Sequence, residues 1–515
     1  MKAITWVAMA ACLAFAACGG DGVSTGSNSA SSASGPSNPG GGGTGGATGG
    51  TTGTPTGGST KTQGNWSAVA PLDGQPGEGE PAVTVDSNGN AIATWLTLGN
   101  SSADTNEIWG NRYVPGQGWG TPVRLDTTDG SVNMTGPSVS PPQIVGNANG
   151  QALALWVQWT PGPNVYALWA RPFDPSSGWG TPVQVALNVA SSTSNDTSAS
   201  YSAGIDGSGN ALVVWTEQTP PASSAIAWRR YTTNGQWSAA AVIPEPAQTG
   251  PGAITGSVIQ NISPNLAVTS TGKAVVAWQQ TDNIQSALWT ATYDPAAGWS
   301  NSNPEVTVAD RTSGAVFSPV AGMDANGNIT LVWGETDIVS GSVHTTTMSQ
   351  RYVAGAGWQG RQPVAPAIAL ADGGYFPVLT VNPQGNALVA WYGPDGALYA
   401  NVSDAKGAWN TAQQLSTKPY LGDNRPPQLA LDDAGDGAVA WNDAGTSGST
   451  HIVASRFVNG AWNAPTPFGT DPQGAFWASM AGNASGDLAL LYVLDVMAQG
   501  STVTEIQTSF LTPGS

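Results

Sequence analysis

The segment Val85–Trp95, which reads VDSNGNAIATW, decides the fold. Apolar residues lie on both sides of a short Asp-Ser-Asn-Gly-Asn segment, and Gly89 can adopt the positive φ that a tight turn requires. The flanking residues are small, apolar or β-branched, as is typical of strands. The stretch therefore predicts a β-hairpin, with one strand ending near Val85 and the next ending at Trp95.

The spacing between the turn glycine and the aromatic residue six positions later recurs through the chain. Eight pairs share it: Gly89/Trp95, Gly150/Trp156, Gly209/Trp215, Gly272/Trp278, Gly327/Trp333, Gly385/Trp391, Gly435/Trp441 and Gly486/Tyr492. A constant spacing in eight copies indicates a repeat architecture in which each copy contributes the same hairpin. We name its two strands A and B, and we expect the aromatic residues of strand B to pack between repeats.

A second motif lies between these hairpins and predicts strands C and D. It is a turn of small residues followed by tryptophan, at Trp66, Trp119, Trp179, Trp237, Trp299, Trp358, Trp409 and Trp462. Most copies follow a short run that ends in an aromatic residue, as at Tyr113, Phe173, Tyr231, Tyr293, Tyr352 and Phe457. Two hairpins in each repeat match the four-stranded blade of a β-propeller.

The two ends of the series are complementary. Trp66 precedes the first A–B hairpin, whereas the last repeat stops after a C-like strand at Glu505–Leu511. The N-terminal strand can therefore supply the missing strand D. We predict an all-β fold, a single eight-bladed β-propeller over residues 64–515 whose N-terminal strand closes the last blade. A solenoid is the alternative, and it would need capping repeats.

The first 63 residues predict export rather than folding. Lys2 gives a positive start and Ala3–Ala17 an apolar run too short to span a bilayer, so residues 1–18 indicate a signal peptide. Leu13–Gly19, LAFAACG, resembles a bacterial lipobox, with Phe15 where Leu is usual. The resemblance implies lipidation of Cys18 and an outer-membrane anchor, on the periplasmic or cell-surface side. An ordinary signal peptide is the alternative.

Residues 19–63 are almost wholly Gly, Ser, Thr, Asn and Ala, so we expect a disordered linker that tethers the propeller. The chain carries 15 Lys and Arg against 33 Asp and Glu. Such an acidic balance disfavours binding to nucleic acid, because phosphate groups are repelled. Both cysteines, Cys12 and Cys18, lie in the leader, so the propeller holds no thiolate site.

Any binding site is expected where the B–C and D–A connections meet. Strands alternate in direction, so these longer connections share one face, which we call the loop face, and the tight A–B and C–D turns share the other, the turn face. Glu217, Glu335 and Asp443 follow a strand-B tryptophan by two positions, and Trp159 and Trp477 fall outside the repeating tryptophan positions. These five are the candidate ligand-binding residues; loop polarity and packing are their alternative roles.

The repeats loosely resemble the Asp-box of sialidase-like propellers, which also combines Asp, Gly and Trp in a hairpin. The gap from Gly to Trp is longer here, and no copy keeps the full box. For catalysis the resemblance implies an arginine cluster and a Tyr–Glu pair. The available arginines, Arg112, Arg230, Arg351 and Arg456, each immediately precede a strand-C aromatic residue, which predicts a structural place in the blade.

Other chemistry finds little support. The turns at Asp86–Asn90 and Asp324–Asn328 place the glycine wrongly for an EF-hand calcium loop. Ala267–Lys273 faintly resembles the docking motif of quinoprotein dehydrogenases, but it occurs once and lacks their vicinal cysteines. His344 and His451 belong to no catalytic motif. We predict no metal and no cofactor.

The sequence as a whole favours a non-enzymatic binding or scaffold module for a glycan or protein partner, with a monomeric head carried on a lipid anchor. A sialidase-like glycoside hydrolase is the first alternative, and it would need two carboxylates, or a Tyr–Glu pair with arginines, in one pocket. A component of an outer-membrane assembly complex is the second alternative, suggested by architecture alone.

Overall fold

A computed structural model gives the structure of the protein. It describes residues 64–513 except for these segments: 98–105, 128–140, 161–164, 191–200, 220–222, 246–253, 255–258, 283–284, 301–302, 309–313, 340–341, 366–374, 394–395, 420–425, 445–448, 470–473 and 499–500. All but 301–302 belong to B–C or D–A connections. The predicted signal peptide, its Cys18 and the predicted linker lie outside the described residues.

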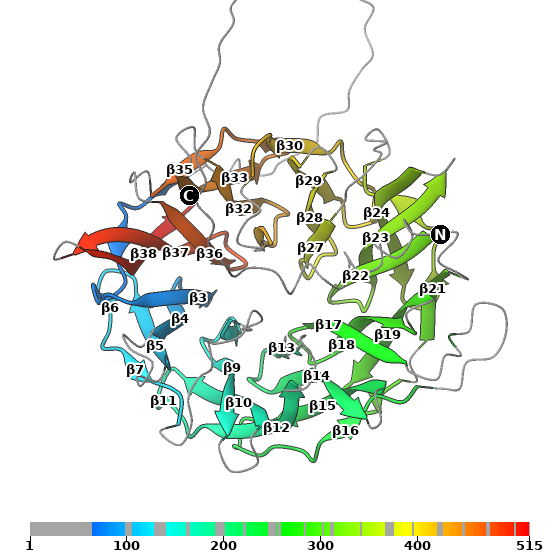
Figure 1. Ribbon diagram of the computed structural model, residues 1–515, viewed down its shortest axis with the longest axis horizontal. Helices are drawn as coiled ribbons and strands as arrows, with labels where there is room; N and C mark the ends of the chain where they lie inside the picture. Colours follow the sequence, from blue (N-terminus) through cyan, green and yellow to red (C-terminus); the bar gives the residue numbers. More distant parts are fainter. Residues whose placement is uncertain are drawn as a thin grey trace, which may run out of the picture.

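The described strands form eight antiparallel sheets arranged in a ring, which confirms the eight-bladed propeller (Figure 1). Strand A of each blade is innermost. From blade 1 to blade 8 it is β3 (Glu78–Val85), β8 (Gln143–Gly146), β13 (Tyr201–Ile205), β17 (Gln260–Val268), β22 (Gly314–Met323), β27 (Tyr375–Val381), β31 (Gln428–Leu431) and β36 (Ala475–Gly482).

Strands B and C follow outward in the same order. Strand B is β4 (Ala91–Thr97), β9 (Ala152–Thr160), β14 (Ala211–Thr219), β18 (Ala274–Thr281), β23 (Ile329–Val339), β28 (Ala387–Tyr392), β32 (Gly437–Ala444) and β37 (Leu488–Ala498). Strand C is β5 (Glu107–Val114), β10 (Val165–Asp174), β15 (Ser223–Tyr231), β19 (Ser286–Asp294), β24 (Ser342–Val353), β29 (Leu398–Ser403), β33 (Thr450–Val458) and β38 (Ser501–Thr512).

Strand D, the outermost, is short and in most blades divided into two pieces. From blade 1 to blade 7 its pieces are β6 (Gly118–Trp119) with β7 (Val123–Arg124), β11 (Gly178–Trp179) with β12 (Val183–Ala190), β16 (Ala241–Val242), β20 (Gly298–Trp299) with β21 (Asn303–Val308), β25 (Gly357–Trp358) with β26 (Gln362–Pro363), β30 (Gln413–Ser416), and β34 (Ala461–Trp462) with β35 (Thr466–Phe468). The N-terminal β1 (Asn65–Trp66) and β2 (Ala70–Pro71) supply this strand to blade 8.

The ring closes as the ends of the sequence predict. Asn65 and Trp66 pair with Thr512 and Leu511, and β2 continues the pairing along β38. Both chain ends therefore lie in one sheet, and β38 gains a neighbour on its outer edge. Closure removes the open end that a solenoid would have had to cap.

The core lies between neighbouring blades. The strand-B aromatics pack into clusters shared by two successive blades, and all are at most 3% exposed: Trp95, Trp156, Trp215, Trp278, Trp333, Trp391, Trp441 and Tyr492. In six blades the strand-D tryptophan packs on the strand-C aromatic residue of its own blade: Tyr113 and Trp119, for example, have ring centroids 5.5 Å apart, and Phe173 and Trp179 5.1 Å. In the other two, Trp409 pairs with Ser403, and Trp66 packs on Phe468 of blade 7. The repeated aromatics thus hold the sheets together.

The A–B turns form as their sequences predict. Gly89 has φ 74°, and the other seven turn glycines are likewise left-handed. Asp86 Oδ1 accepts hydrogen bonds from the backbone N–H groups of Asn88 and Asn90, at 2.8 and 2.9 Å. The carboxylate therefore serves the turn itself, as Asp commonly does.

Odd and even blades differ on this turn face. The first turn residue is Asp in the odd blades (Asp86, Asp206, Asp324 and Asp432), and Asn or Thr in the even blades (Asn147, Thr269, Asn382 and Asn483). Strand C carries an arginine immediately before its aromatic residue in the odd blades alone, at Arg112, Arg230, Arg351 and Arg456.

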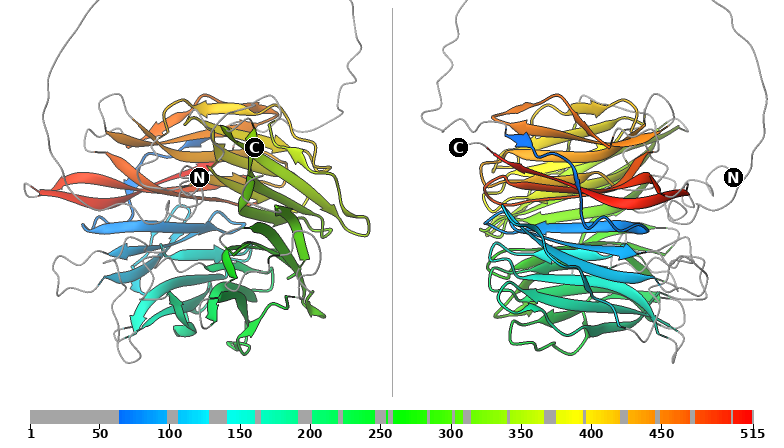
Figure 2. Two further views of the ribbon diagram at one scale, coloured as in Figure 1. Left: turned by 45° about the vertical axis from the view of Figure 1, so that its right-hand side comes forward. Right: turned by 90° about the vertical axis from the view of Figure 1, so that its left-hand side faces the viewer.

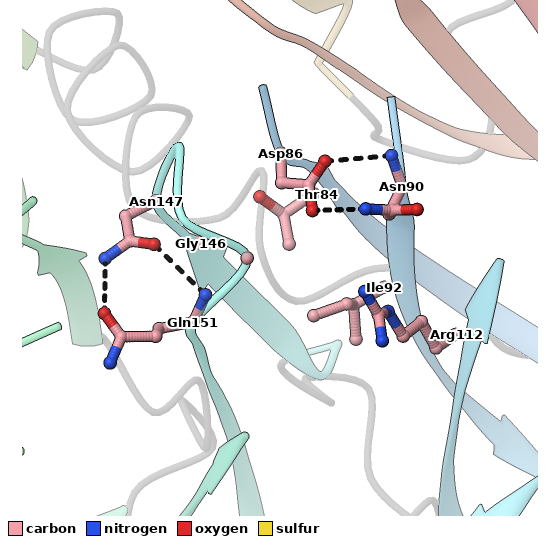
Figure 3. Close-up of a pocket in the computed structure, with 9 residues that line it drawn as sticks. Thr84, Asp86, Asn90, Ile92, Arg112, Gly146, Asn147 and Gln151 are labelled. Atoms are coloured by element: carbon pink, nitrogen blue, oxygen red, sulfur yellow. Dashed lines mark hydrogen bonds between the residues drawn. The ribbon is translucent and has the colours of Figure 1, made fainter. Parts of the chain in front are cut away.

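Each such arginine therefore belongs to an odd-to-even seam. Figure 3 shows the seam between blades 1 and 2, where Asp86, Asn90 and Arg112 face Asn147 and Gln151. Arg351 pairs with Asp324 at 3.5 Å and donates to Ala405 O of the next blade. The arginines thus lie one in each odd blade, in separate seams, and a sialidase-type cluster in one pocket does not form.

Candidate functional site

The three acids predicted from strand B each accept a hydrogen bond from the tryptophan two positions before. Trp215 Nε1 donates to Glu217 Oε2 at 2.5 Å and Trp333 Nε1 to Glu335 Oε2 at 3.0 Å. These contacts satisfy buried indole N–H groups that would otherwise be costly. A period of two places residues i and i+2 on one face of a strand, so the sequence already held this signal.

Asp443 and Glu335 have further partners. Asp443 Oδ1 accepts from Trp441 Nε1 at 3.4 Å and from Ser416 Oγ at 2.5 Å, and Glu335 forms an ion pair with Arg361 at 3.1 Å. The three acids lie in blades 3, 5 and 7, which are not neighbours, so the structure does not bring them together. Their role in binding a ligand stays a prediction.

The repeated tryptophans of strand B are enclosed and cannot contact a ligand. In blade 2, Trp156 is 1% exposed, packs among residues of blades 1 and 2, and donates its Nε1–H to Gln158 Oε1 at 3.1 Å. In blade 6, Trp391 is 3% exposed and stacks on Tyr399, with ring centroids 5.9 Å apart. It shares its cluster with buried valines of blade 5. These rings are part of the core and lie outside any ligand site.

Trp159 lies near the loop-face end of β9, where its backbone pairs with Tyr166. Its side chain is outside the part of the chain whose side chains the structure describes. Trp477 is described, and it occupies an unusual position: its φ is 55°, in the left-handed region that non-glycine residues rarely adopt. The pairing of β36 with β37 shifts register at this point, between Phe476 and Ser479.

The same bulge recurs in the innermost strands of other blades. Glu80, Ser263 and Ser318 also have φ near 50°, and each lies at a register shift near the start of strand A. A proline follows each of these three, and six of the eight repeats have proline eight positions before the turn glycine: Pro81, Pro142, Pro264, Pro319, Pro377 and Pro427. Proline thus follows three of the four left-handed residues of strand A, and Ala478 takes its place after Trp477.

A left-handed non-glycine residue costs about 1–3 kcal/mol, and such residues concentrate at functional sites. Strand A runs from the loop face to the turn face, so the bulges lie at the loop-face end of the innermost strands (Figures 1 and 2). Blade 8 differs from the others by placing tryptophan at this position. The bulge thus presents Trp477 at the inner rim of the loop face.

Trp477 lies in the seam between blades 8 and 1. Its ring is half-buried and meets Phe476 edge-on at 4.8 Å. Across the seam the ring packs on Gly79 of β3, where a Cβ atom would lie 3.0 Å from it. Only glycine gives the indole ring this close approach. Gly79 stands between two buried glutamates, Glu78 and Glu80.

Glu78 is the most perturbed acid of this seam. It is 1% exposed, and its Oε2 accepts the backbone N–H of Ile506 in β38 at 3.0 Å. Burial is the main reason that the pKa of Glu78 is raised to about 8, and the neighbouring carboxylates of Asp73 and Glu505 raise it further. A buried carboxyl beside other carboxyls holds its proton because ionisation would place like charges together.

Asp495 adds a further acid to the same seam. Val493 packs in the core shared by blades 8 and 1, and strand alternation places Asp495 on the same side of β37. Burial raises the pKa of Asp495 above its ordinary value. Asp73, Glu78, Glu80 and Asp495 form what we call the acidic seam. Glu505 pairs with Leu494, which packs toward blade 7, so its side chain lies on the other side of blade 8 and only its charge reaches Glu78.

A second acid with a raised pKa, the half-buried Glu245, lies after strand D of blade 3. Burial raises its pKa to about 7, opposed by hydrogen bonds from Asn261 and Gln280. Gln280 Nε2 donates to Glu245 Oε2 at 3.3 Å, and Asn261 Oδ1 accepts from Trp278 Nε1 at 2.7 Å. This acid belongs to the polar network that ties blade 3 to blade 4.

Among the described residues, no group of three or more His, Cys, Asp and Glu side chains is placed to hold a metal ion. Within the same ranges no helix is long and apolar enough to cross a membrane.

No protein-family model and no curated protein matches the chain. Solved structures resemble it at low identity. They include the BP39L lectin of Burkholderia pseudomallei, 14% identical with a TM-score of 0.46 over 76% of this chain and 100% of the lectin. The polysaccharide lyase Uly1 is 10% identical, with a TM-score of 0.47 over 85% of this chain and 90% of the lyase. The sialidase of Trypanosoma rangeli is 12% identical, with a TM-score of 0.35 over 66% of this chain and 57% of the sialidase.

Proposed function

We propose that the protein is a non-enzymatic glycan-binding module, displayed on the cell surface or in the periplasm by a lipid on Cys18. The observation that carries the proposal is Trp477, a half-buried indole held by a left-handed backbone at the inner rim of the loop face. A sugar ring presents apolar C–H groups that pack against such a ring. Binding sites of this kind combine aromatic walls with a few polar groups.

Neighbouring groups supply the polar part. Asp73 and Asp495 are half-buried, so their carboxylates can accept hydrogen bonds from sugar hydroxyl groups, whereas Glu78 and Glu80 are 1% and 6% exposed and enclosed. A strained backbone that is retained in the folded protein supports a functional role for the residue that it positions. Trp477 is therefore better suited to contact a ligand than the repeated tryptophans, which pack within or between blades.

The test is a glycan array probed with the wild-type protein and with Trp477→Ala. The matched control is Trp358→Ala, which removes a half-buried tryptophan from strand D of blade 5, where the ring packs on Tyr352. We expect Trp477→Ala to lose binding by about tenfold or more, which corresponds to at least about 1.4 kcal/mol. The control should bind as the wild type does once circular dichroism shows that both are folded.

A fluorogenic glycosidase panel on the same preparation separates binding from catalysis. Turnover of any glycoside would overturn the non-enzymatic proposal and favour a hydrolase. Equal binding by Trp477→Ala and wild type would remove Trp477 from the site.

A further inference from the structure

We infer that the loop face holds two binding rims, one on blade 8 and one on blade 5, and that the ligand is a linear polysaccharide that contacts both. The inference rests on the proposed function, because it names the class of glycan that the Trp477 site takes. It is drawn from three features that blades 5 and 8 share: a phenylalanine before a left-handed bulge, a bulge aromatic that packs on glycine, and the longest strands B and C.

The bulge of blade 5 is built like the bulge of blade 8. Ser318 has φ 49°, and the register of β22 with β23 shifts between Phe317 and Val320, as the register of β36 with β37 shifts around Trp477. The residue before the left-handed position is phenylalanine in both blades, Phe317 and Phe476, whereas it is glycine in blade 1 and isoleucine in blade 4. Blades 5 and 8 therefore place an aromatic residue at the same point of the inner rim of the loop face.

Phe317 packs on a glycine that interrupts the repeat. A Cβ atom on Gly334 would lie 2.4 Å from the Phe317 ring, so only glycine admits the ring there. Gly334 directly follows Trp333, and none of the other seven strand-B aromatics is followed by glycine. Phe317 itself is half-buried. The glycine therefore fixes a partly exposed ring at the rim, as Gly79 does for Trp477.

The same two blades have the longest strands B and C. Strand B begins two residues after the turn glycine in every blade, so its length measures how far it extends toward the loop face. β23 and β37 have 11 residues, and β24 and β38 have 12, more than the strands B and C of the other blades. Between them along the ring, β28 and β29 of blade 6 have 6 residues each. The strands of blades 5 and 8 thus extend further toward the loop face than those of blade 6.

Two separate aromatic rims favour a long ligand over a short one. Blade 8 is the third blade after blade 5, so the two rims lie apart on the ring (Figure 1). A sugar ring packs on one aromatic side chain at a time, so a disaccharide occupies a single rim. A linear chain that reaches both rims makes its second contact within one complex, and its affinity then exceeds that of either contact alone.

The experiment compares soluble oligosaccharides of two lengths by titration calorimetry with the full-length protein in detergent. The probes are linear oligomers of glucose, of mannose and of xylose, each as the disaccharide and as a chain of about ten units, which is long enough to reach a second rim. For a sugar that binds, we expect the long chain to bind at least about a hundredfold more tightly than the disaccharide.

Two variants test the rim of blade 5. Phe317→Ala should lower the affinity for the long chain by about tenfold or more and leave that for the disaccharide unchanged, because Trp477 still holds the disaccharide. Phe317→Leu keeps an apolar side chain over Gly334 without a flat ring, so it should fold as the wild type does and show the same loss. The matched control is Trp358→Ala in strand D of the same blade, which should keep the wild-type preference for the long chain.

Outcomes separate this inference from the proposed function. Equal affinity for the two lengths, abolished by Trp477→Ala, would overturn the second rim and leave glycan binding standing. A full preference for the long chain in both Phe317 variants would also overturn it, because repeated positions along the chain would then explain the gain. Binding of terminal or branched glycans on the array, with no binding of the linear oligomers, would overturn the linear class. A blank array together with no binding of either length would overturn both proposals.

Discussion

Substitution of Glu78 by Gln measures how much folding stability is lost when the buried Glu78 side chain ionises. The amide keeps an acceptor for the N–H of Ile506 and offers an N–H donor toward Asp73, and it cannot ionise. Burial raises the pKa of Glu78 from 4.5 to about 8 in the folded chain. The folded protein therefore holds a proton that the unfolded chain releases, so stability falls as pH rises between these two values.

The magnitude follows from the pKa difference. Each pH unit between 4.5 and 8 removes about 1.4 kcal/mol from the free energy of unfolding. The wild type should thus lose up to about 3 kcal/mol by pH 7 and up to about 5 kcal/mol by pH 8 from this one group. Glu78→Gln should lack this loss and should be more stable than the wild type at pH 8.

Urea denaturation of both proteins at about pH 5, 7 and 8.5 measures the effect. The matched control is Glu107→Gln, which alters another glutamate of blade 1 that is ion-paired with Arg124. The control should keep the wild-type dependence on pH over this range. The reasoning is refuted if the wild-type free energy of unfolding does not fall between pH 5 and 8.5, or if Glu78→Gln falls as steeply.

Three further outcomes test the packing and closure of the ring. Gly322→Ala would place a Cβ atom 2.3 Å from Cγ2 of Val381 in the next blade, so urea denaturation should show a loss of about 1–3 kcal/mol in the free energy of unfolding. An unchanged free energy of unfolding would show that this seam is loosely packed. Glu217→Ala should lower the free energy of unfolding by about 1–3 kcal/mol, because it leaves the buried indole N–H of Trp215 without an acceptor. Glu217→Gln keeps an acceptor and should retain most of that stability, so equal losses in the two variants would contradict the hydrogen-bond account. Deletion of residues 64–72 exposes the edge of β38, so light scattering should detect association through that edge, and a monodisperse variant of unchanged stability would contradict the closure argument.

Most of the fold could be predicted because the information is local and repeated. Gly89 and Trp95 stand six positions apart since one turn and one strand separate them, and the same unit recurs in every blade. The closing strand was also predictable, because Trp66 repeats a strand-D motif without its own blade. Such features depend on residues close together in sequence, where turn geometry and strand alternation set the outcome.

The candidate site was predictable only in part. Trp477 stood out because it departs from the repeat, yet the bulge that presents it and the glycine beneath it were not foreseen. Gly79 lies near one end of the chain and Trp477 near the other, so their contact exists only once the ring is closed. The raised pKa of Glu78 likewise depends on ring closure, because burial raises it most, and Glu505 from the opposite end of the chain raises it further, against the lowering effect of the Ile506 N–H.

Odd and even blades alternate on the turn face, and this explains why the closing seam departs from the repeat on the loop face alone. On the turn face, Asn in an even blade donates its amide to the backbone of the next odd blade, as Asn147 does to Asp206 O and Asn382 to Asp432 O. An Asp carboxylate cannot donate in this way, and Thr269 of blade 4 bonds within its own turn instead. With eight blades the alternation passes through the closure unchanged, and Asn483 donates to Asp86 O at 2.8 Å.

The turn face of the closing seam is therefore one more even-to-odd seam, and an odd number of blades would have set two like turns side by side. The amide-to-backbone hydrogen bond across the closing junction is the same as the one between blades 2 and 3. On the loop face the same junction carries Trp477 and the acidic seam, which depart from the repeat. Because a repeated scaffold uses its regular residues for packing, the proposed function assigns the ligand to the residues of the loop face that depart from the repeat.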